Sequence, residues 1–172
     1  MLRNGANNIT TYGVILVATA LSAMQGHAQA QDEHAKVVSH IEAYAIEQDD
    51  AGQEIRLTAE SINPGGIIEY HMTYTNISDA SLAQFVIQGD VPNETTYVSA
   101  GEVNDAPAIF EVSVADIGWA SPPVIRYVED NEGILRPVEV PDEEFEALRW
   151  RLVEPINPGE VVSATYRIKV EN

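Results

Sequence analysis

The stretch that decides the fold is N-P-G-G-I-I-E-Y-H-M-T-Y-T-N, residues 63–76. Four apolar side chains alternate there with polar or charged ones: Ile68, Tyr70, Met72 and Tyr74. Alternation sends successive side chains to opposite faces, so it predicts a β-strand with one buried face. The Pro-Gly pair before the strand predicts a tight turn, because proline fixes φ and glycine accepts a positive φ.

The same turn recurs near the C-terminus, where the I-N-P-G of residues 62–65 is repeated at residues 156–159. Residues 162–170 then alternate in the same phase as the strand after the first turn. Two copies are too few for a repeat array, so we expect the two turns to form equivalent corners of one domain.

Further short apolar or alternating segments are separated by proline, glycine, asparagine and aspartate. They cover residues 84–88, 95–99, 110–115 and 148–152. Many short strands with frequent turns predict an all-β fold, an antiparallel β-sandwich. The predicted core side chains are Ile68, Tyr70, Phe85, Val86, Trp150 and Tyr166.

The segment before the first Pro-Gly turn reads as two strands, residues 37–47 and 54–59, around an Asp49–Gly52 turn. Its alanines and glutamates would also permit a helix. The turn chemistry and the neighbouring strands favour the hairpin. A short helical turn is predicted at residues 142–148, after Pro141.

The first thirty residues have the three parts of a secretory signal. Arg3 precedes an uncharged apolar run at residues 12–24, and the small residues Ala28 and Ala30 follow as candidate cleavage positions. The run is shorter than the roughly 20 residues of a membrane span, although an uncleaved anchor is the alternative. We therefore expect three parts: a signal peptide at 1–30, a strand or hairpin segment packing on the sandwich at 31–60, and the sandwich core at 61–172.

Composition excludes several function classes. The chain of 172 residues has 27 Asp and Glu against 9 Lys and Arg, a net charge of −18, and no cysteine. Nucleic acid is an unfavourable partner, because binding it requires a basic surface. The missing cysteine rules out disulfides, thiol chemistry and zinc ribbons. No second long apolar run follows the signal, so we expect no stable membrane insertion of the mature chain.

No catalytic, cofactor-binding or metal-binding residues are predicted, and we expect that the chain is not an enzyme. Histidines outside the signal, His34, His40 and His71, lack metal-ligand spacing. Serine nucleophile motifs such as G-x-S-x-G are missing. The remaining serines considered lie in turn-like contexts, where hydroxyls cap backbone groups: Ser61, Ser78, Ser81 and Ser121.

Calcium is the sharpest ligand hypothesis, because hard cations bind carboxylate and carbonyl oxygens in loops. The candidate ligands are Asp49, Asp50, Asp130, Asn131 and Glu132. The spacing of a calcium-binding loop is missing, and residues 129–133 read better as a hairpin turn. We therefore assign no metal.

Three motifs in order resemble the DUF11-type repeat domain. They are the N-P-G-G-x-I-E-Y-H-M-T-Y-T-N from Asn63, V-P-N-E-T-T-Y-V at residues 91–98, and L-R-W at 148–150 followed by P-G-E at 158–160. The resemblance covers roughly residues 37–170. It departs from the family at residues 113–119, which read S-V-A-D-I-G-W where the family usually has Asp-Gly-Gly after the strand.

This resemblance implies an immunoglobulin-like β-sandwich in an exported bacterial protein, periplasmic, secreted or on the cell surface. It implies no catalytic residues. We expect a non-catalytic structural or protein-binding module of the cell envelope, with another envelope or surface protein as partner. The alternative is a periplasmic accessory or chaperone-like protein that pairs with partner strands.

Overall fold

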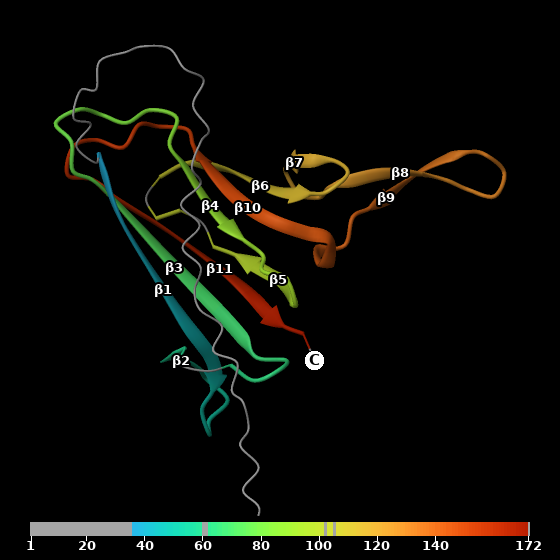
Figure 1. Cartoon of the computed structure of the whole chain (residues 1–172), viewed down its shortest axis with the longest axis horizontal. Coiled ribbons are helices and arrows are strands. Elements are labelled where there is room, and N and C mark those ends of the chain that lie inside the picture. The colour runs from blue at the N-terminus through green and yellow to red at the C-terminus, as the bar shows by residue number, and fades with distance from the viewer. Residues whose placement is uncertain (1–35, 60–61, 102, 105, 172) are drawn as a thin grey trace, which may run out of the picture. The chain divides into compact units, whose positions relative to one another are not determined.

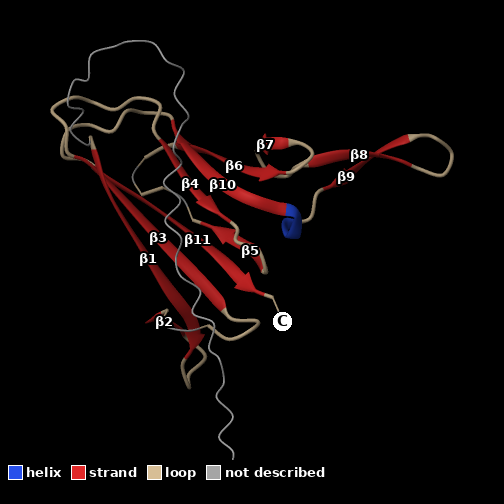
Figure 2. Cartoon of the chain, viewed as in Figure 1, coloured by secondary structure: helices blue, strands red, loops and turns tan. Residues whose placement is uncertain are grey.

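A computed structural model describes residues 36–59, 62–101, 103–104 and 106–171 (Figure 1). These residues form eleven strands in three antiparallel sheets (Figure 2). The five-stranded sheet has the order β2 (Glu54–Thr58), β1 (Val37–Gln48), β3 (Ile67–Asn76), β11 (Val161–Val170) and β5 (Thr95–Ala100). The four-stranded sheet has the order β4 (Val86–Asp90), β10 (Phe145–Leu152), β6 (Ala108–Val114) and β7 (Gly118–Ala120).

The third sheet contains only β8 (Ile125–Glu129) and β9 (Leu135–Glu139). A short 3-10 turn, η1 (Asp142–Glu144), precedes β10. The all-β, antiparallel prediction is therefore confirmed. The predicted helical turn after Pro141 is shorter than expected, because the chain is already extended at Phe145. The predicted signal peptide, residues 1–30, lies outside the described residues.

The alternating side chains of the two larger sheets fill one hydrophobic core. The fully buried members include Met72, Ile87, Leu148 and Ile168, from strands of both sheets. The Tyr70 ring packs against this core and stacks on the buried Tyr166 ring, with the two centroids 4.9 Å apart. Burial of these large apolar surfaces is the main term that stabilises the domain.

Most of the predicted core is correct, with one error. Trp150 and Tyr166 are buried, whereas Ile68, Tyr70 and Phe85 are partly buried against the core. The prediction for Val86 is wrong, since its side chain is 42% exposed. In β4 the neighbouring Ile87 faces inward, so Val86 falls on the outer face of the pleat.

The strand β4 continues through Gly89, beyond the end of the predicted segment at residues 84–88. The aromatic ring of Tyr166 occupies the space beside this glycine, and an added Cβ would lie 2.6 Å from its Cε1 atom. Tyr166 donates a hydrogen bond of 3.0 Å to the carbonyl of Asp90. Glycine is thus the residue that lets the four-stranded sheet approach this ring.

The two Pro-Gly turns form reciprocal corners of the five-stranded sheet. Gly65 and Gly159 both have positive φ, 79° and 76°. The N–H of Gly65 donates to Val170 at the end of β11, and that of Gly159 donates to Asn76 at the end of β3, each at 2.8 Å. Each turn therefore closes the end of the strand that pairs with the strand it starts. The predicted equivalence of the two corners is confirmed.

Candidate protein-binding surfaces

The hairpin β8–β9, which we call the arm, pairs with no other strand among the described residues (Figure 1). Its root is fixed. Val124 and Val140 are buried, and the N–H of Val140 donates to the Val124 carbonyl at 2.8 Å. Arg126 ties the root further by ion pairs to Asp116 at 2.8 Å and Glu144 at 2.6 Å.

Beyond its root the arm exposes apolar side chains on both faces. Register places Ile125, Tyr127 and Leu135 on one face, where Tyr127 is 67% and Leu135 63% exposed. On the other face lie Val128 and Val138, both exposed. A two-stranded hairpin is marginally stable alone, and exposed apolar patches mark interaction sites. The arm is therefore the strongest candidate for a protein-binding site.

Sequence reasoning identified the turn of this hairpin but missed its flanking surface. The available signal was the lack of alternation in residues 124–128 and 134–138, where apolar residues fall on both sides of each strand. A strand in a one-sided sheet alternates, whereas these two do not.

The arm's turn uses a carboxylate that was a calcium candidate. Asp130 accepts hydrogen bonds from the N–H groups of Glu132 at 2.9 Å and Ile134 at 3.0 Å, and from Arg136 Nε at 2.8 Å. The Asp49 carboxylate accepts in the same way from Ala51 and Gln53, each at 2.9 Å. Both aspartates thus hold turns, the role expected of Asp in such loops.

A second candidate surface is the outer edge of β1. β2 pairs with only the second half of β1, Tyr44–Gln48, whereas β3 pairs with residues 37–46 on the other side. Among the described residues, no strand pairs with the outer edge of residues 37–42. Val38 is 52% and Ile41 54% exposed there. A free strand edge offers backbone hydrogen bonds to another chain.

A basic pair, Arg149 and Arg151, lies on the outer face of β10 and not in a cleft. Both guanidinium groups reach the Glu111 carboxylate, at 2.8 and 2.7 Å, and Arg149 lies 4.2 Å from the Trp119 ring centroid. Hydrogen bonds from Arg151 and then Arg149 lower the pKa of Glu111. The two guanidinium groups share one carboxylate and keep a net charge of +1, but both are already engaged by Glu111 and so are poorly placed to anchor a client chain.

The buried carboxylate of Glu69 is likewise paired. Arg56 and Arg167 approach its two oxygens at 2.7 and 2.8 Å, and Arg167 also reaches Glu54 at 3.0 Å. The cluster joins β2, β3 and β11 on the outer face of the sheet. Since a buried charge is costly unless it is paired, its role here is structural.

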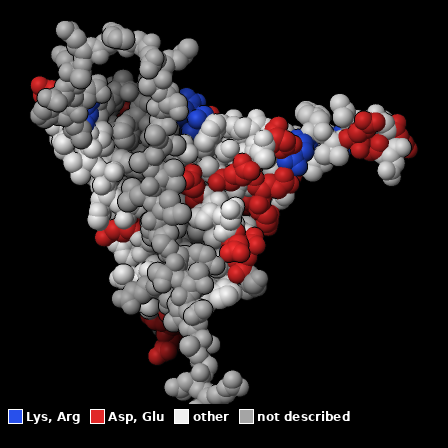
Figure 3. Space-filling model, in the orientation of Figure 1, with Lys and Arg blue, Asp and Glu red and all other residues white. Residues whose placement is uncertain are grey.

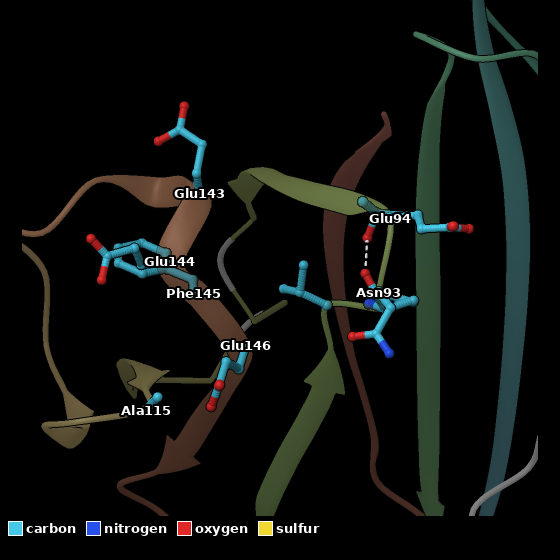
Figure 4. A pocket seen from close by; sticks show the side chains of 10 residues that line it. Asn93, Glu94, Ala115, Glu143, Glu144, Phe145 and Glu146 are labelled. Carbon is cyan, nitrogen blue, oxygen red and sulfur yellow. Dashed lines mark hydrogen bonds between the residues drawn. The ribbon is translucent and has the colours of Figure 1, made fainter. Parts of the chain in front are cut away.

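A shallow hollow of about 530 Å³ lies between the β4–β5 connection and the start of β10. Four glutamates line it, but Figure 4 shows Glu94, Glu143, Glu144 and Glu146 pointing in different directions. A cation site requires oxygens converging on one point. Among the described residues no group of three His, Cys, Asp or Glu side chains could hold a metal ion.

The two histidines of the described residues lie on neighbouring strands. His40 is exposed and its Nε2 lies 3.4 Å from Glu42 Oε1, and His71 on β3 lies directly opposite Glu42 in the sheet register. The Ser78 and Ser121 hydroxyls donate to Asn76 Oδ1 and the Phe110 carbonyl, as expected of turn serines. His34 and Ser61 lie outside the described residues.

Among the charged side chains visible in Figure 3, Asp and Glu cover more of the surface than Lys and Arg. Such a surface repels polyanions. No helix in the described part of the chain has the length and apolarity needed to cross a membrane. Comparison with protein-family models, with curated proteins and with solved structures finds no match to this chain.

Proposed function

We propose that this chain is an exported, non-catalytic protein-binding module of the bacterial cell envelope, built as an immunoglobulin-like β-sandwich. The observation that carries the proposal is the arm: an ordered hairpin whose apolar side chains face solvent on both sides. Tyr127, at the centre of β8, is of a residue type that protein interfaces use as an anchor. The partner in this proposal is another envelope or surface protein.

Export is supported by the signal-like pattern of residues 1–30 and by the resemblance to DUF11-type domains. The two corners and the strands β3 and β11 carry much of that resemblance, and these strands pair without a register shift. An acidic, cysteine-free domain with a single core suits a role that requires no redox chemistry.

The free edge of β1 favours a second candidate, an accessory or chaperone-like protein that pairs with partner strands. Backbone groups of residues 37–42 would supply the affinity. The two candidates differ in kinetics. A structural module holds its partner stably, whereas a chaperone releases its client.

A photo-crosslinking amino acid at Tyr127 tests the main proposal in the native envelope. The matched control position is Val153, which is 62% exposed and lies outside the arm. We expect one stoichiometric envelope protein to crosslink at position 127 and not at position 153. Equal labelling at both positions, or none at either, would contradict binding through the arm.

The double substitution Tyr127→Ser and Leu135→Ser supplies the functional control. It removes apolar surface that makes few internal contacts, so the melting temperature should stay unchanged while the partner is lost. Fractionation of the cell and N-terminal sequencing of the purified chain test export. A cytoplasmic chain that still begins at Met1 would contradict an envelope role.

A further inference from the structure

The free edge of β1 has a defined hydrogen-bonding pattern. The Ala43 carbonyl faces the β2 side, since it accepts from the N–H of Ala59 at 3.3 Å. In an antiparallel strand the backbone groups of alternate residues point to the same side. Val37, Ser39 and Ile41 therefore each present an N–H and a C=O to the free edge. Lys36 conforms to the pattern, because its carbonyl accepts from Ile77 on the opposite side.

This edge lacks the features that protect the other sheet edges. β7 has three residues, β2 has five, β5 pairs irregularly with β11, and β4 contains Gly89. Residues 37–42 contain no proline, glycine or bulge. Long, regular edges invite pairing with another chain, and natural proteins usually block them. Among the described residues nothing blocks this edge, which favours its use in pairing.

The sequence of the edge is self-complementary in one antiparallel register. When Ser39 faces Ser39 of a second copy, Val37 lies opposite Ile41, so the residues with free backbone groups pair with one another. In that register Lys36 lies opposite Glu42, which places opposite charges across both ends of the ribbon. Cross-strand apolar and opposite-charge pairs each stabilise a sheet.

The neighbouring register satisfies the backbone equally but fits the side chains less well. It would centre on His40 facing His40 and would place Val38 opposite Glu42 and Lys36 opposite Tyr44. The ion pair is lost and two ionisable rings meet at the symmetry axis. The register centred on Ser39 is therefore preferred.

The net charge of −18 opposes association over most of the surface, but the β1 edge is an exception. Residues 36–43 carry one lysine, one glutamate and one histidine, which gives no net charge with histidine neutral. Two copies approaching along this edge thus bring no excess of like charge together.

We propose that two copies of this chain form a twofold symmetric dimer by antiparallel pairing of β1 with β1, centred on Ser39. The contact joins the two five-stranded sheets into one continuous sheet. It does not use the arm, so it stands whether or not the arm binds a protein. A dimer would carry two arms and would bind a clustered partner with higher avidity than one copy.

Single cysteines test the register, because the chain has no native cysteine. Directly opposed residues of a hydrogen-bonded pair lie about 5.5 Å apart between Cα atoms, within disulfide range. We expect full-length Ser39→Cys to form a disulfide-linked dimer under mild oxidation, much faster than the exposed Ser99→Cys control on β5. A dimer that forms faster with His40→Cys, or equal rates at all three positions, would overturn the register.

Charge reversal tests the dimer itself by analytical ultracentrifugation. Lys36→Glu and Glu42→Lys should each weaken dimerisation about tenfold, because each puts like charges at both ends of the ribbon. The double variant restores opposite charges and should dimerise like the parent chain. Equal weakening in the double variant, or a parent chain that stays monomeric up to about 1 mM, well above the concentrations at which weak complexes form, would overturn the proposal.

A single proline substitution at Ser39 distinguishes an effect on edge pairing from an effect on folding. Ser39→Pro removes an N–H that faces the free edge and spares the ladder to β3, a position where sheets tolerate proline. We expect a folded monomer with the circular dichroism of the parent chain. Ser39→Thr keeps the N–H and should remain dimeric. A Ser39→Pro variant that is folded and still dimeric would contradict backbone pairing at this edge.

Discussion

The hairpins β1–β2 and β8–β9 have turns of the same kind, but they differ in the strands that lie beside them. In both, an aspartate carboxylate accepts two backbone N–H groups, and a glycine with positive φ closes the loop: Gly52 at 76° and Gly133 at 77°. Yet β1 pairs with β3 over residues 37–46, whereas the arm pairs with no further strand in the described chain.

The difference shows that turn chemistry decides whether a hairpin forms and side-chain pattern decides what it joins. In β1 the small residues Ala43 and Ala45 face inward, and Ala45 is buried. The arm has apolar residues on both faces, and no other strand in the described part of the chain pairs with it. The inward face of β1 thus completes a sheet in its own chain, whereas the arm requires cover from elsewhere.

The largest expected difference in the free energy of unfolding is between removing an aromatic ring from the core and removing one from the arm. Trp150→Ala should destabilise the domain by about 3–5 kcal/mol, because the ring is buried and its Nε1 donates to the Gly101 carbonyl at 3.0 Å. Tyr127→Ala should change the free energy of unfolding by less than about 0.5 kcal/mol. Urea unfolding of both variants measures this, and similar losses would mean that the arm is packed against the body.

Adding a methyl group at a glycine should give a smaller difference in stability between the core and the arm. Gly89→Ala forces its Cβ against the Tyr166 ring and should cost about 1–3 kcal/mol in global stability. Gly133→Ala strains a positive φ at the tip of the arm, where the nearest side-chain atom, Glu129 Oε1, is 3.4 Å away. We expect it to loosen the arm and leave the melting temperature of the core unchanged. A lower melting temperature in Gly133→Ala would mean that the arm unfolds together with the core.

Substituting the two turn aspartates compares the two hairpins directly. Asp49→Ala and Asp130→Ala each leave two backbone N–H groups without their acceptor, at a cost of about 1 kcal/mol. We expect Asp49→Ala to lower global stability, because its hairpin belongs to the five-stranded sheet. Asp130→Ala should speed hydrogen exchange only in residues 125–139. Exchange that spreads to β10 in Asp130→Ala would contradict an independent arm.

The smallest effect is a pH dependence confined to the arm. Hydrogen bonds from the Ile134 N–H, Arg136 and the Glu132 N–H hold the pKa of Asp130 below its ordinary value. A lowered pKa in the folded state stabilises it above the unfolded value, and this stabilisation is lost as pH falls through the folded pKa. We expect arm resonances to shift toward disorder on acidification while core resonances persist. Asp130→Asn should abolish the dependence, and an unchanged titration would show that another group is responsible.

Much of the fold was predictable because it rests on local patterns. The alternation of β3 and β11, the Pro-Gly corners and the turn at Asp49 each determine their own geometry, and the structure confirms them. The error at Val86 has a different origin. A short apolar run has no unique phase, and only the position of Ile87 against the opposite sheet decides which side chains face inward.

The candidate surfaces were harder to predict, because they depend on which strands lack neighbours. The unpaired half of β1 follows from the short length of β2, and the isolation of the arm follows from how β10 and β6 pair. Neither fact can be predicted from the residues of the edge or of the arm alone. Only the strand pairing of the folded chain shows which apolar strand residues are exposed: Val38, Ile41, Tyr127 and Leu135.

The register of the five-stranded sheet also has a mechanical consequence. Val37 lies opposite Asn76, and Val161 lies opposite Thr75, so β1 and β11 begin at the same end of the sheet. The chain enters β1 at that end and leaves β11 at the other (Figure 1). A pull on the two ends would therefore act along the strands, across hydrogen bonds that run perpendicular to them. Under such shear the bonds of β1–β3 and β3–β11 bear the force together, the geometry of a module that can stay folded under tension.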